Sequence, residues 1–470
     1  MPNPFDQQPN HSSGITRREW FDTWGREWMK IGGIGLGGLT MPGLAAAQAA
    51  TPTAVAPTAK RVILLMFNGG TPQHETWDPK PLAPANIRGE FGAISSATPG
   101  LRVGELMPRL AQLSNHFAVL RAVVTNDNSH SSSGYQMLTG VPHQPLNKES
   151  ALPKPPNNWP SMGALVRALK QDVGQLPSAV TLPEHIWNDG NFPWPGQDAG
   201  FLGRRHDPWL IHCQPQHNTF NVPGLSPRDD VAANRIQLRR RLLEQFDNAA
   251  AHFDRDPAVN SYNLHARQAL DLLSRQQTSN AFDLGQESDS TRDRYGRSRY
   301  AQSVLLARRL IERNVSLVQV NWTRIKDKPN QGGWDTHSKH CESLKSFLMP
   351  MMDQAVSALL EDLRDRGLLD DTLIVWQGEF GHTPKINAKA GRDHWGSCFC
   401  VAMAGGGIQG GCVHGSSDSH GAFPVDGVVR PKDIISTVFH CLGYDPDTVV
   451  HDPLDRPTPI SRGRVIRQIL

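Results

Sequence analysis

The sequence predicts an α/β fold in which a mostly parallel central sheet is sandwiched between helices. Five continuous apolar runs have the length and character of strands that are buried on both faces. Between the third and fourth runs, apolar residues recur every three or four positions, which is typical of a helix that packs on one face of a sheet. Strands that alternate with helices favour parallel pairing through right-handed crossovers.

The predicted strands are spread over the chain from residue 61 onward. They are RVILLMF at 61–67, AVLRAVV at 118–124, VSLVQV at 315–320, TLIVW at 372–376 and CFCVAMA at 398–404. A cluster of polar residues follows each of the first four strands. Because ligand sites in parallel sheets gather beyond the carboxyl ends of the strands, we expect the functional residues in these clusters.

The clearest predicted helix precedes the fourth strand and ends at Gly367, a residue type common after helix ends. Pro350 either divides this helix or begins its main part. Its apolar positions are Leu344, Leu348, Met352, Ala355, Leu359 and Leu363.

Residues 141–230 are rich in proline, tryptophan and histidine, and they show little periodicity, which predicts long loops. Residues 230–313 carry the helical stretches RIQLRRRLLEQF and AQSVLLARRLIERN, which we expect to form a helical layer beside the sheet. Their basic faces are interpreted as solvated, because the total charge is close to neutral. The prediction is therefore one domain over 61–470, with 141–313 as a loop-rich and helical insertion.

Composition excludes several classes of protein. Lys and Arg outnumber Asp and Glu by 48 to 45 in 470 residues, so the net charge of +3 disfavours a protein that wraps a nucleic acid. A hydrophobic content of 38% excludes a polytopic membrane protein. The six cysteines are scattered and form no CxxC pair, so they predict neither a disulfide scaffold nor a structural zinc site.

The first 49 residues predict a twin-arginine export signal. Arg17 and Arg18 precede a weakly apolar stretch at 31–44, and Ala-x-Ala cleavage sites follow. A basic turn before an amphipathic helix is the alternative, and the glycines of the stretch disfavour it. Residues 50–60 predict a flexible linker. We therefore expect a periplasmic or secreted mature chain without a membrane span, since the stretch is too short for one.

Three motifs, GGWDTHSKH, GEFGHTP and GRDHW, concentrate carboxylates and imidazoles at predicted strand ends. Oxygen and nitrogen ligands without thiolates suit Zn²⁺, Mn²⁺, Ca²⁺ or Mg²⁺. A single Asp-x-His is more often a carboxylate that orients its neighbouring imidazole, but three such groups favour a metal site. The candidates are Asp335, His337, His340, Glu379, His382, Asp393 and His394.

Two further groups keep alternatives open. Arg392 either binds an anionic substrate group in a bidentate manner or forms an ion pair with Asp or Glu. In NSHSSSGYQMLTG, His130 and the serines from Ser131 to Ser133 precede a predicted helix. They present a nucleophile or an oxyanion contact at the helix N-terminus, or they form an ordinary N-cap.

From residue 61 to 470 the sequence resembles the secreted "domain of unknown function 1501" family, which is similar in motif order to the sulfatase and alkaline phosphatase superfamily. The resemblance implies a sheet between helices, with one or two metal ions where hydrolytic relatives cleave sulfate or phosphate esters. It rests on GGTPQHETWDPKP, HSSSGYQMLTG, AFDL with RYG, LLARRLIERNV, GGWDTH, GEFGHTPKIN, GRDHW and RPKDIISTVFHCLGYDPD.

The resemblance implies three sets of metal ligands in this chain. Asp335 with His337 or His340 matches an Asp/His ligand pair, Glu379 matches the acidic ligand after the fourth strand, and His394 matches a later histidine ligand.

The sequence also departs from the hydrolytic pattern. Asn68 stands where relatives place Asp, and Phe380 follows Glu379 where they place His or Asn after Asp. His130 falls on the nucleophile position and Gly134 on the arginine of the sulfatase motif. A formylglycine sulfatase is therefore disfavoured, and hydrolysis by another route is open.

These features predict an exported metal-dependent hydrolase of sulfate, phosphate or related esters, with an anionic ester or sulfated glycan as substrate and no nucleic acid as partner. A bound metal would polarise the ester and activate water. The expected metal ligands are Asp335, His337, Glu379, Asp393 and His394, and the catalytic candidates are His130, Ser131 and Arg392. The alternative is a non-catalytic exported protein that binds an anionic glycan or a cell-surface partner.

Overall fold

The computed structural model describes residues 55–170, 176–188, 192–217, 220, 222, 238, 241 and 280–470. Within it, Val55–Leu470 form one compact unit. The predicted export signal, the first part of the predicted linker and nearly all of the predicted helix at 235–246 lie outside the described residues.

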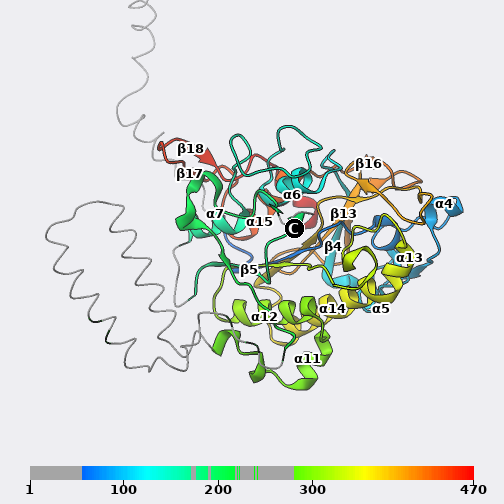
Figure 1. The fold of residues 1–470 in the computed structure, drawn as a ribbon, viewed down its shortest axis with the longest axis horizontal. Helices are drawn as coiled ribbons and strands as arrows, with labels where there is room; N and C mark the ends of the chain where they lie inside the picture. The colour runs from blue at the N-terminus through cyan, green and yellow to red at the C-terminus, as the bar shows by residue number, and fades with distance from the viewer. Residues whose placement is uncertain are drawn as a thin grey trace, which may run out of the picture. The chain divides into compact units, whose positions relative to one another are not determined.

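An eight-stranded sheet forms the centre of the fold, with strand order β14-β4-β13-β10-β1-β9-β5-β8 (Figure 1). The strands are β1 (Arg61–Met66), β4 (Phe117–Val123), β5 (Ala179–Leu182), β8 (Trp209–Leu210), β9 (Leu317–Asn321), β10 (Thr372–Gln377), β13 (Phe399–Ala404) and β14 (Cys412–His414). All pairs are parallel except those of β13, which is antiparallel to both neighbours. The predicted mostly parallel sheet and its five predicted strands are confirmed.

Helices cover both faces of the sheet (Figure 1). Successive side chains of β1 alternate between the two hydrophobic layers, with Ile63 and Leu65 in one and Val62 and Leu64 in the other. The first layer contains α5 (Pro108–Gln112), α11 (Asp289–Tyr295), α12 (Arg299–Glu312) and α14 (Met349–Asp365), and the second contains α6 (His130–Thr139), α7 (Met162–Leu169) and α15 (Pro431–Cys441). The predicted α/β sandwich is therefore observed.

The remaining elements are short. They are α4 (Ala85–Arg88), α13 (His340–Ser343), β2 (Ala93–Ser95), β3 (Arg102–Gly104), β6 (Trp187–Asn188), β7 (Phe192–Pro193), β11 (Gly381–His382), β12 (His394–Trp395), β15 (Ser416–Ser417), β16 (Pro424–Asp426), β17 (Val449–His451) and β18 (Pro457–Pro459).

The predicted helix before the fourth strand is confirmed as α13, a π-helical turn at Leu344–Leu348 and α14. Of the two alternatives for Pro350, the structure shows that it begins the main part, because it lies in the first turn of α14. The residues before this boundary are also right-handed helical, so Pro350 lies inside a continuous helix, at the point where the hydrogen-bond pattern changes from π to α.

The prediction of long loops over 141–230 is wrong for three elements in that stretch. α7 belongs to the second helical layer, and β5 and β8 extend the central sheet. These elements are short, and β5 gains its hydrogen bonds by pairing with β9, which is remote in sequence. A local pattern carries little information about such pairing.

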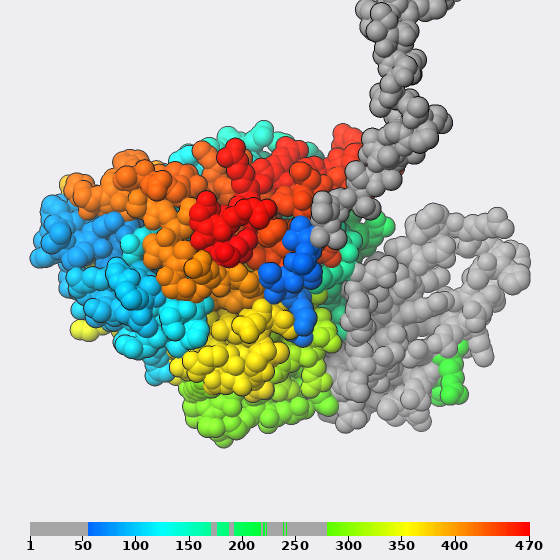
Figure 2. All heavy atoms as spheres, turned by 180° about the vertical axis from the view of Figure 1, so that it is seen from behind, coloured from blue at the N-terminus to red at the C-terminus, as the bar shows by residue number. Residues whose placement is uncertain are grey.

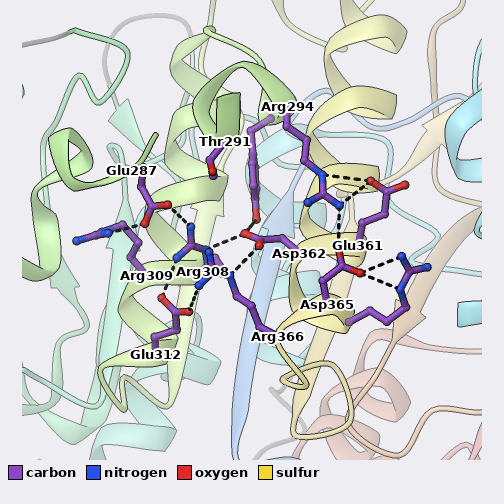
Figure 3. Close-up of polar contacts among 12 residues, drawn as sticks. Glu287, Thr291, Arg294, Arg308, Arg309, Glu312, Glu361, Asp362, Asp365 and Arg366 are labelled. Atoms are coloured by element: carbon purple, nitrogen blue, oxygen red, sulfur yellow. Dashed lines mark hydrogen bonds and ion pairs between the residues drawn. The ribbon is translucent and has the colours of Figure 1, made fainter. Parts of the chain in front are cut away.

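The prediction that the basic face of α12 is solvated is wrong, because Arg308 on this helix is buried. The Arg308 side chain is only 1% exposed, and it forms ion pairs with Glu287 (2.8 Å), Glu312 (2.8 Å) and Asp362 (3.0 Å). Figure 3 shows this network between α12 and α14. Asp362 also accepts a hydrogen bond from the Tyr295 hydroxyl at 2.9 Å. The acidic side chains that neutralise Arg308 come mostly from other elements.

The first described residues lie on the surface beside the C-terminal part of the chain, where blue meets orange and red in Figure 2. The backbone N–H of Thr58 donates to the carbonyl oxygen of Cys441 at 2.9 Å, and the Thr58 hydroxyl donates to the carbonyl oxygen of Gly406 at 2.7 Å. In the described part of the chain, no helix is long and apolar enough to cross a membrane.

Candidate active site

The candidate site lies at the carboxyl edge of the sheet. Asn68 follows β1, His130 follows β4, Asp335 follows β9 and Glu379 follows β10. His394 precedes β13, and because β13 runs antiparallel to its neighbours, its beginning lies at the same edge. Polar residues that are more than 300 positions apart in the sequence thus meet at one place, as predicted from the strand ends.

Asp335 is the centre of the site. Its Oδ1 lies 2.9 Å from Nε2 of His394 and 2.9 Å from Nε2 of His337, and its Oδ2 lies 3.2 Å from Nε2 of His130. The other nitrogen of His130, Nδ1, lies 2.7 Å from Oε1 of Glu379. His130, Asp335 and His394 each offer one ligand atom within 4.8 Å of the others, and we call these three residues the metal-candidate cluster.

The electrostatics of the cluster favour a cation. Burial lowers the pKa of His130, but its hydrogen bonds to Asp335 and Glu379 outweigh burial and raise the pKa to about 10. A positively charged imidazole thus lies between the two carboxylates. Oε2 of Glu379 and Oδ1 of Asn68 are buried and accept no hydrogen bond within the described residues, so oxygen donors are available beside the cluster.

The orientation of His394 also fits a metal ligand. Its Nδ1 donates a hydrogen bond to the carbonyl oxygen of Asn128 at 2.7 Å. In the neutral imidazole this leaves the lone pair on Nε2, which faces Asp335. A backbone carbonyl that orients the second nitrogen is usual for metal-binding histidines. The residues present therefore fit a divalent ion bound by imidazole nitrogen and carboxylate oxygen.

Gly69, which follows β1, allows the loop after β1 to approach the loop that carries Asp335. Gly69 has a φ of +102°, and a Cβ on it would lie 2.2 Å from the backbone N of Asp335. The backbone N–H of Gly69 donates to Oε1 of Glu379 at 2.7 Å, and its carbonyl oxygen accepts from Nε2 of His382 at 2.9 Å. Burial lowers the pKa of His382 to about 3, so this imidazole is neutral and supports the turn.

We expect Gly69→Ala to destabilise the protein by at least about 3 kcal/mol, because overlap with the Asp335 backbone adds to the strain of a positive φ. Gly100→Ala is the matched control, since Gly100 has a φ of +81° and open space around it. The control should lose only about 1–2 kcal/mol. Urea unfolding measures both, and equal losses would show that the close approach of the two loops is unimportant.

His337 and Asp393 form the outer part of the site. The hydrogen bond to Asp335 raises the pKa of His337 to about 9 against the effect of burial. Nδ1 of His337 donates to Oδ1 of Asp393 at 2.7 Å. Asp393 was predicted as a metal ligand, but the structure places it on the far side of His337, where it also accepts from Asn387 at 3.1 Å. Its observed contacts orient His337.

Arg392 forms the ion pair that was one of its two predicted alternatives. Its side chain is fully buried, and Nη2 lies 2.6 Å from Oε1 of Glu75. Nε donates to the same oxygen at 3.1 Å, and other N–H groups donate to backbone carbonyls, including that of Thr383 at 3.0 Å. His340 lies on the same carboxylate, with Nε2 3.3 Å from Oε2 of Glu75. Arg392 is thus a structural residue in this conformation, and the prediction that it contacts substrate does not agree with its position.

The serines at the start of α6 act differently from either alternative predicted for them. The N-cap residue Ser129 makes no capping hydrogen bond with its side chain. Ser132 donates to Oδ1 of Asp127 at 2.8 Å, and Ser133 donates to the carbonyl oxygen of Glu379 at 2.5 Å. Ser131 is 1% exposed and does not line the cavity described below. Ser132 and Ser133 therefore fix α6 to the segments that follow β4 and β10.

A cavity of about 490 Å³ opens onto the metal-candidate cluster. Its walls include Trp187, Trp194 and Arg324, none of which was singled out from the sequence. Arg324 lies in the polar cluster after the third predicted strand, so a basic residue at that strand end was the available signal. The tryptophans lie in the stretch predicted as loops, and no sequence signal connected them to the site.

The comparisons with known proteins identify a family. A family model described as "Protein of unknown function (DUF1501)" matches residues 59–470. The chain belongs to this family. The match covers nearly all of the described part of this DUF1501 protein and confirms the family that the motifs predict. No curated protein matches the chain.

Several solved structures are similar to this DUF1501 protein. One is the PsFucS1 sulfatase from Pseudoalteromonas sp., with 13% identity, a TM-score of 0.38, and coverage of 85% of this chain and 70% of that one. Another is the phosphonate monoester hydrolase SpPMH from Silicibacter pomeroyi, with 11% identity, a TM-score of 0.37, and coverage of 87% and 76%. A magnesium-bound mutant of the TAB5 alkaline phosphatase has 12% identity, a TM-score of 0.31, and coverage of 74% and 92%.

Proposed function

We propose that this protein is an exported, metal-dependent hydrolase of sulfate, phosphate or related esters. The observation that supports it most is the metal-candidate cluster at the floor of a cavity whose wall carries an arginine. Carboxylates and imidazoles at the carboxyl edge of a parallel sheet, in a cavity of this size, are typical of an active site. The twin-arginine motif supports export.

His130, Asp335 and His394 would hold the ion, with Glu379 beside them, and His130 would release its Nε2 proton when the ion binds, because a histidine ligand is neutral. When bound, a divalent ion supplies a Lewis acid that polarises the ester and makes water more acidic. Imidazole nitrogens favour Zn²⁺, and carboxylate oxygens also suit Mn²⁺, Ca²⁺ and Mg²⁺.

The other residues of the cavity bind and orient the substrate. Arg324 lines the cavity, and its guanidinium can pair with the anionic ester group. His337 is the most exposed imidazole around Asp335, with 45% of its side chain exposed, and its raised pKa makes it a positive charge that would attract the anionic ester group. Trp187 and Trp194 offer flat apolar surfaces to the remainder of the substrate.

One observation favours the alternative, a non-catalytic protein that binds an anionic glycan or a cell-surface partner. Both nitrogens of His130 are hydrogen bonded to carboxylates, and Ser131 does not line the cavity, so neither is free to attack an ester. Hydrolysis then requires attack by water, which needs no side-chain nucleophile.

A hydrolysis assay separates the two functions. We expect protein that is stripped with a chelator and reloaded with Zn²⁺ or Mn²⁺ to hydrolyse p-nitrophenyl sulfate, phosphate or phosphonate. His394→Ala and Glu379→Ala should reduce the rate by about 100-fold or more, since they remove a ligand or its neighbour. Ser131→Ala is the control and should lose activity only in part. If the loaded wild type is no faster than His394→Ala on every ester, the binding function is correct.

A further inference from the structure

A second cavity, of about 340 Å³, lies between the loop after α6, the start of α15 and the segment around residue 460. Its volume is within the range of small-molecule sites, about 300–1,000 Å³. Three basic side chains line it, those of Arg430, Lys432 and Arg462, and no acidic side chain among the described residues does.

The three cations are not neutralised by the surrounding protein. None of them forms an ion pair within the part of the chain that the structure describes. The neighbouring carboxylate of Asp433 accepts hydrogen bonds from backbone N–H groups instead, those of Arg430 at 2.9 Å and Arg464 at 2.8 Å. Like charges around one cavity repel, and an anion bound between them relieves the repulsion.

The rest of the lining is largely apolar. Leu146 and Ile460 contribute aliphatic side chains, and Trp159 contributes an indole ring, over which the Arg462 guanidinium lies at 5.5 Å. The cavity therefore combines positive charge with apolar surface.

We propose that this cavity is a second anion-binding site, which takes a sulfate, phosphate or carboxylate group carried on an apolar or ring-shaped body. The site depends on neither the metal nor hydrolysis, so it goes beyond the function proposed above. One loop contributes to both cavities, because Leu146 lines the second and Glu149 and Ser150 line the first. Hydrogen bonds from Lys148 N to the Ser132 hydroxyl (2.9 Å) and from His130 N to Glu149 (2.6 Å) fix this loop to α6.

Isothermal titration calorimetry of the metal-free full-length protein tests the proposal. The probes are inorganic sulfate, p-nitrophenyl sulfate and uncharged p-nitrophenyl β-glucoside. We expect saturable binding of p-nitrophenyl sulfate, weaker binding of inorganic sulfate and no binding of the glucoside. Equal affinity for the two anions would identify a free anion as the ligand and overturn the requirement for an apolar body. Binding of the uncharged glucoside with equal affinity, or no binding of either anion, would overturn the site.

Matched variants assign the binding to this cavity. Lys432→Gln combined with Arg462→Gln should weaken binding of p-nitrophenyl sulfate by about tenfold or more, the effect of losing hydrogen bonds to a charged group. Arg464→Gln changes an exposed arginine outside the cavity lining and should have no effect. Arg324→Gln changes the first cavity, so it should remove only a binding event that belongs to that cavity, and the binding assigned to the second cavity should persist. The proposal is wrong if Arg324→Gln removes the binding and the double variant does not. Arg430→Gln gives a second test if the double variant unfolds.

Discussion

Asp335→Ala is expected to remove divalent-ion binding at the candidate active site. Asp335 is the carboxylate that contacts all three imidazoles, and no other described carboxylate contacts more than one of them. Without Asp335, the three imidazoles of His130, His337 and His394 lose their shared hydrogen-bond acceptor. Their rings remain close, because the ring centroid of His394 lies 4.3 Å from that of His130 and 4.6 Å from that of His337. We expect ion affinity to fall by more than about 100-fold, beyond the usual effect of residues that only orient a ligand.

Two measurements test this expectation. Metal content after dialysis against Zn²⁺ or Mn²⁺ should approach zero in the variant. The wild type should gain about 2.7 kcal/mol of stability at an ion concentration 100 times its Kd, and Asp335→Ala should gain less than about 0.4 kcal/mol at the same concentration.

Asp393→Ala is the matched control for Asp335→Ala. The Asp393 carboxylate contacts His337 from the side away from Asp335 and is 51% exposed. Its loss should weaken ion binding by about tenfold, as for a residue that orients another. Stoichiometric metal in Asp335→Ala would show that the cluster is not the metal site.

Arg308→Ala is expected to reduce the free energy of unfolding by about 3–5 kcal/mol, the usual effect of breaking a buried ion pair by removing one partner. The carboxylates of Glu287 and Asp362 are each only 8% exposed, and they would lose their shared counter-charge. Figure 3 shows both on opposite sides of the Arg308 guanidinium. In the variant, Glu287 keeps its ion pair with Arg309, and Asp362 keeps its ion pair with Arg366 at 2.7 Å. The fold should therefore persist.

Urea unfolding of Arg308→Ala and Arg364→Ala measures this effect against a control. Arg364 pairs with Asp365 at 3.0 Å, and both side chains are 47% exposed. An exposed pair contributes less than about 1 kcal/mol, so the control should remain close to the wild type. If the two variants lose the same stability, burial of the Arg308 network is not what stabilises α12 against α14.

The central fold could be predicted because its signals are local. Five strands of the sheet are buried on both faces, so each appears as a continuous apolar run, and the helix that ends near Gly367 appears as an apolar stripe. Strand direction then placed Asp335, Glu379 and His394 at one edge, because polar residues at the carboxyl ends of parallel strands lie close together.

Other features depend on partners that are remote in the sequence. Arg308 and Arg392 have the same local signature as solvated arginines, yet both are buried, and Arg392 pairs with a glutamate 317 positions away. Whether a charge is buried depends on whether an opposite charge meets it in the folded chain, and no local pattern contains that information.

The sequence by itself thus determined the layers of the fold, the edge that carries the site and the chemical types of its side chains. Only the tertiary structure decided which of these side chains meet. In the folded chain His130 lies between Asp335 and Glu379. Arg392 and Ser131 do not line the cavity, whereas Trp187 in β6 and Trp194 after β7 do. The physical reason is that hydrophobic periodicity acts over a few residues, whereas a site is formed by contacts between segments that only the packed sheet brings together.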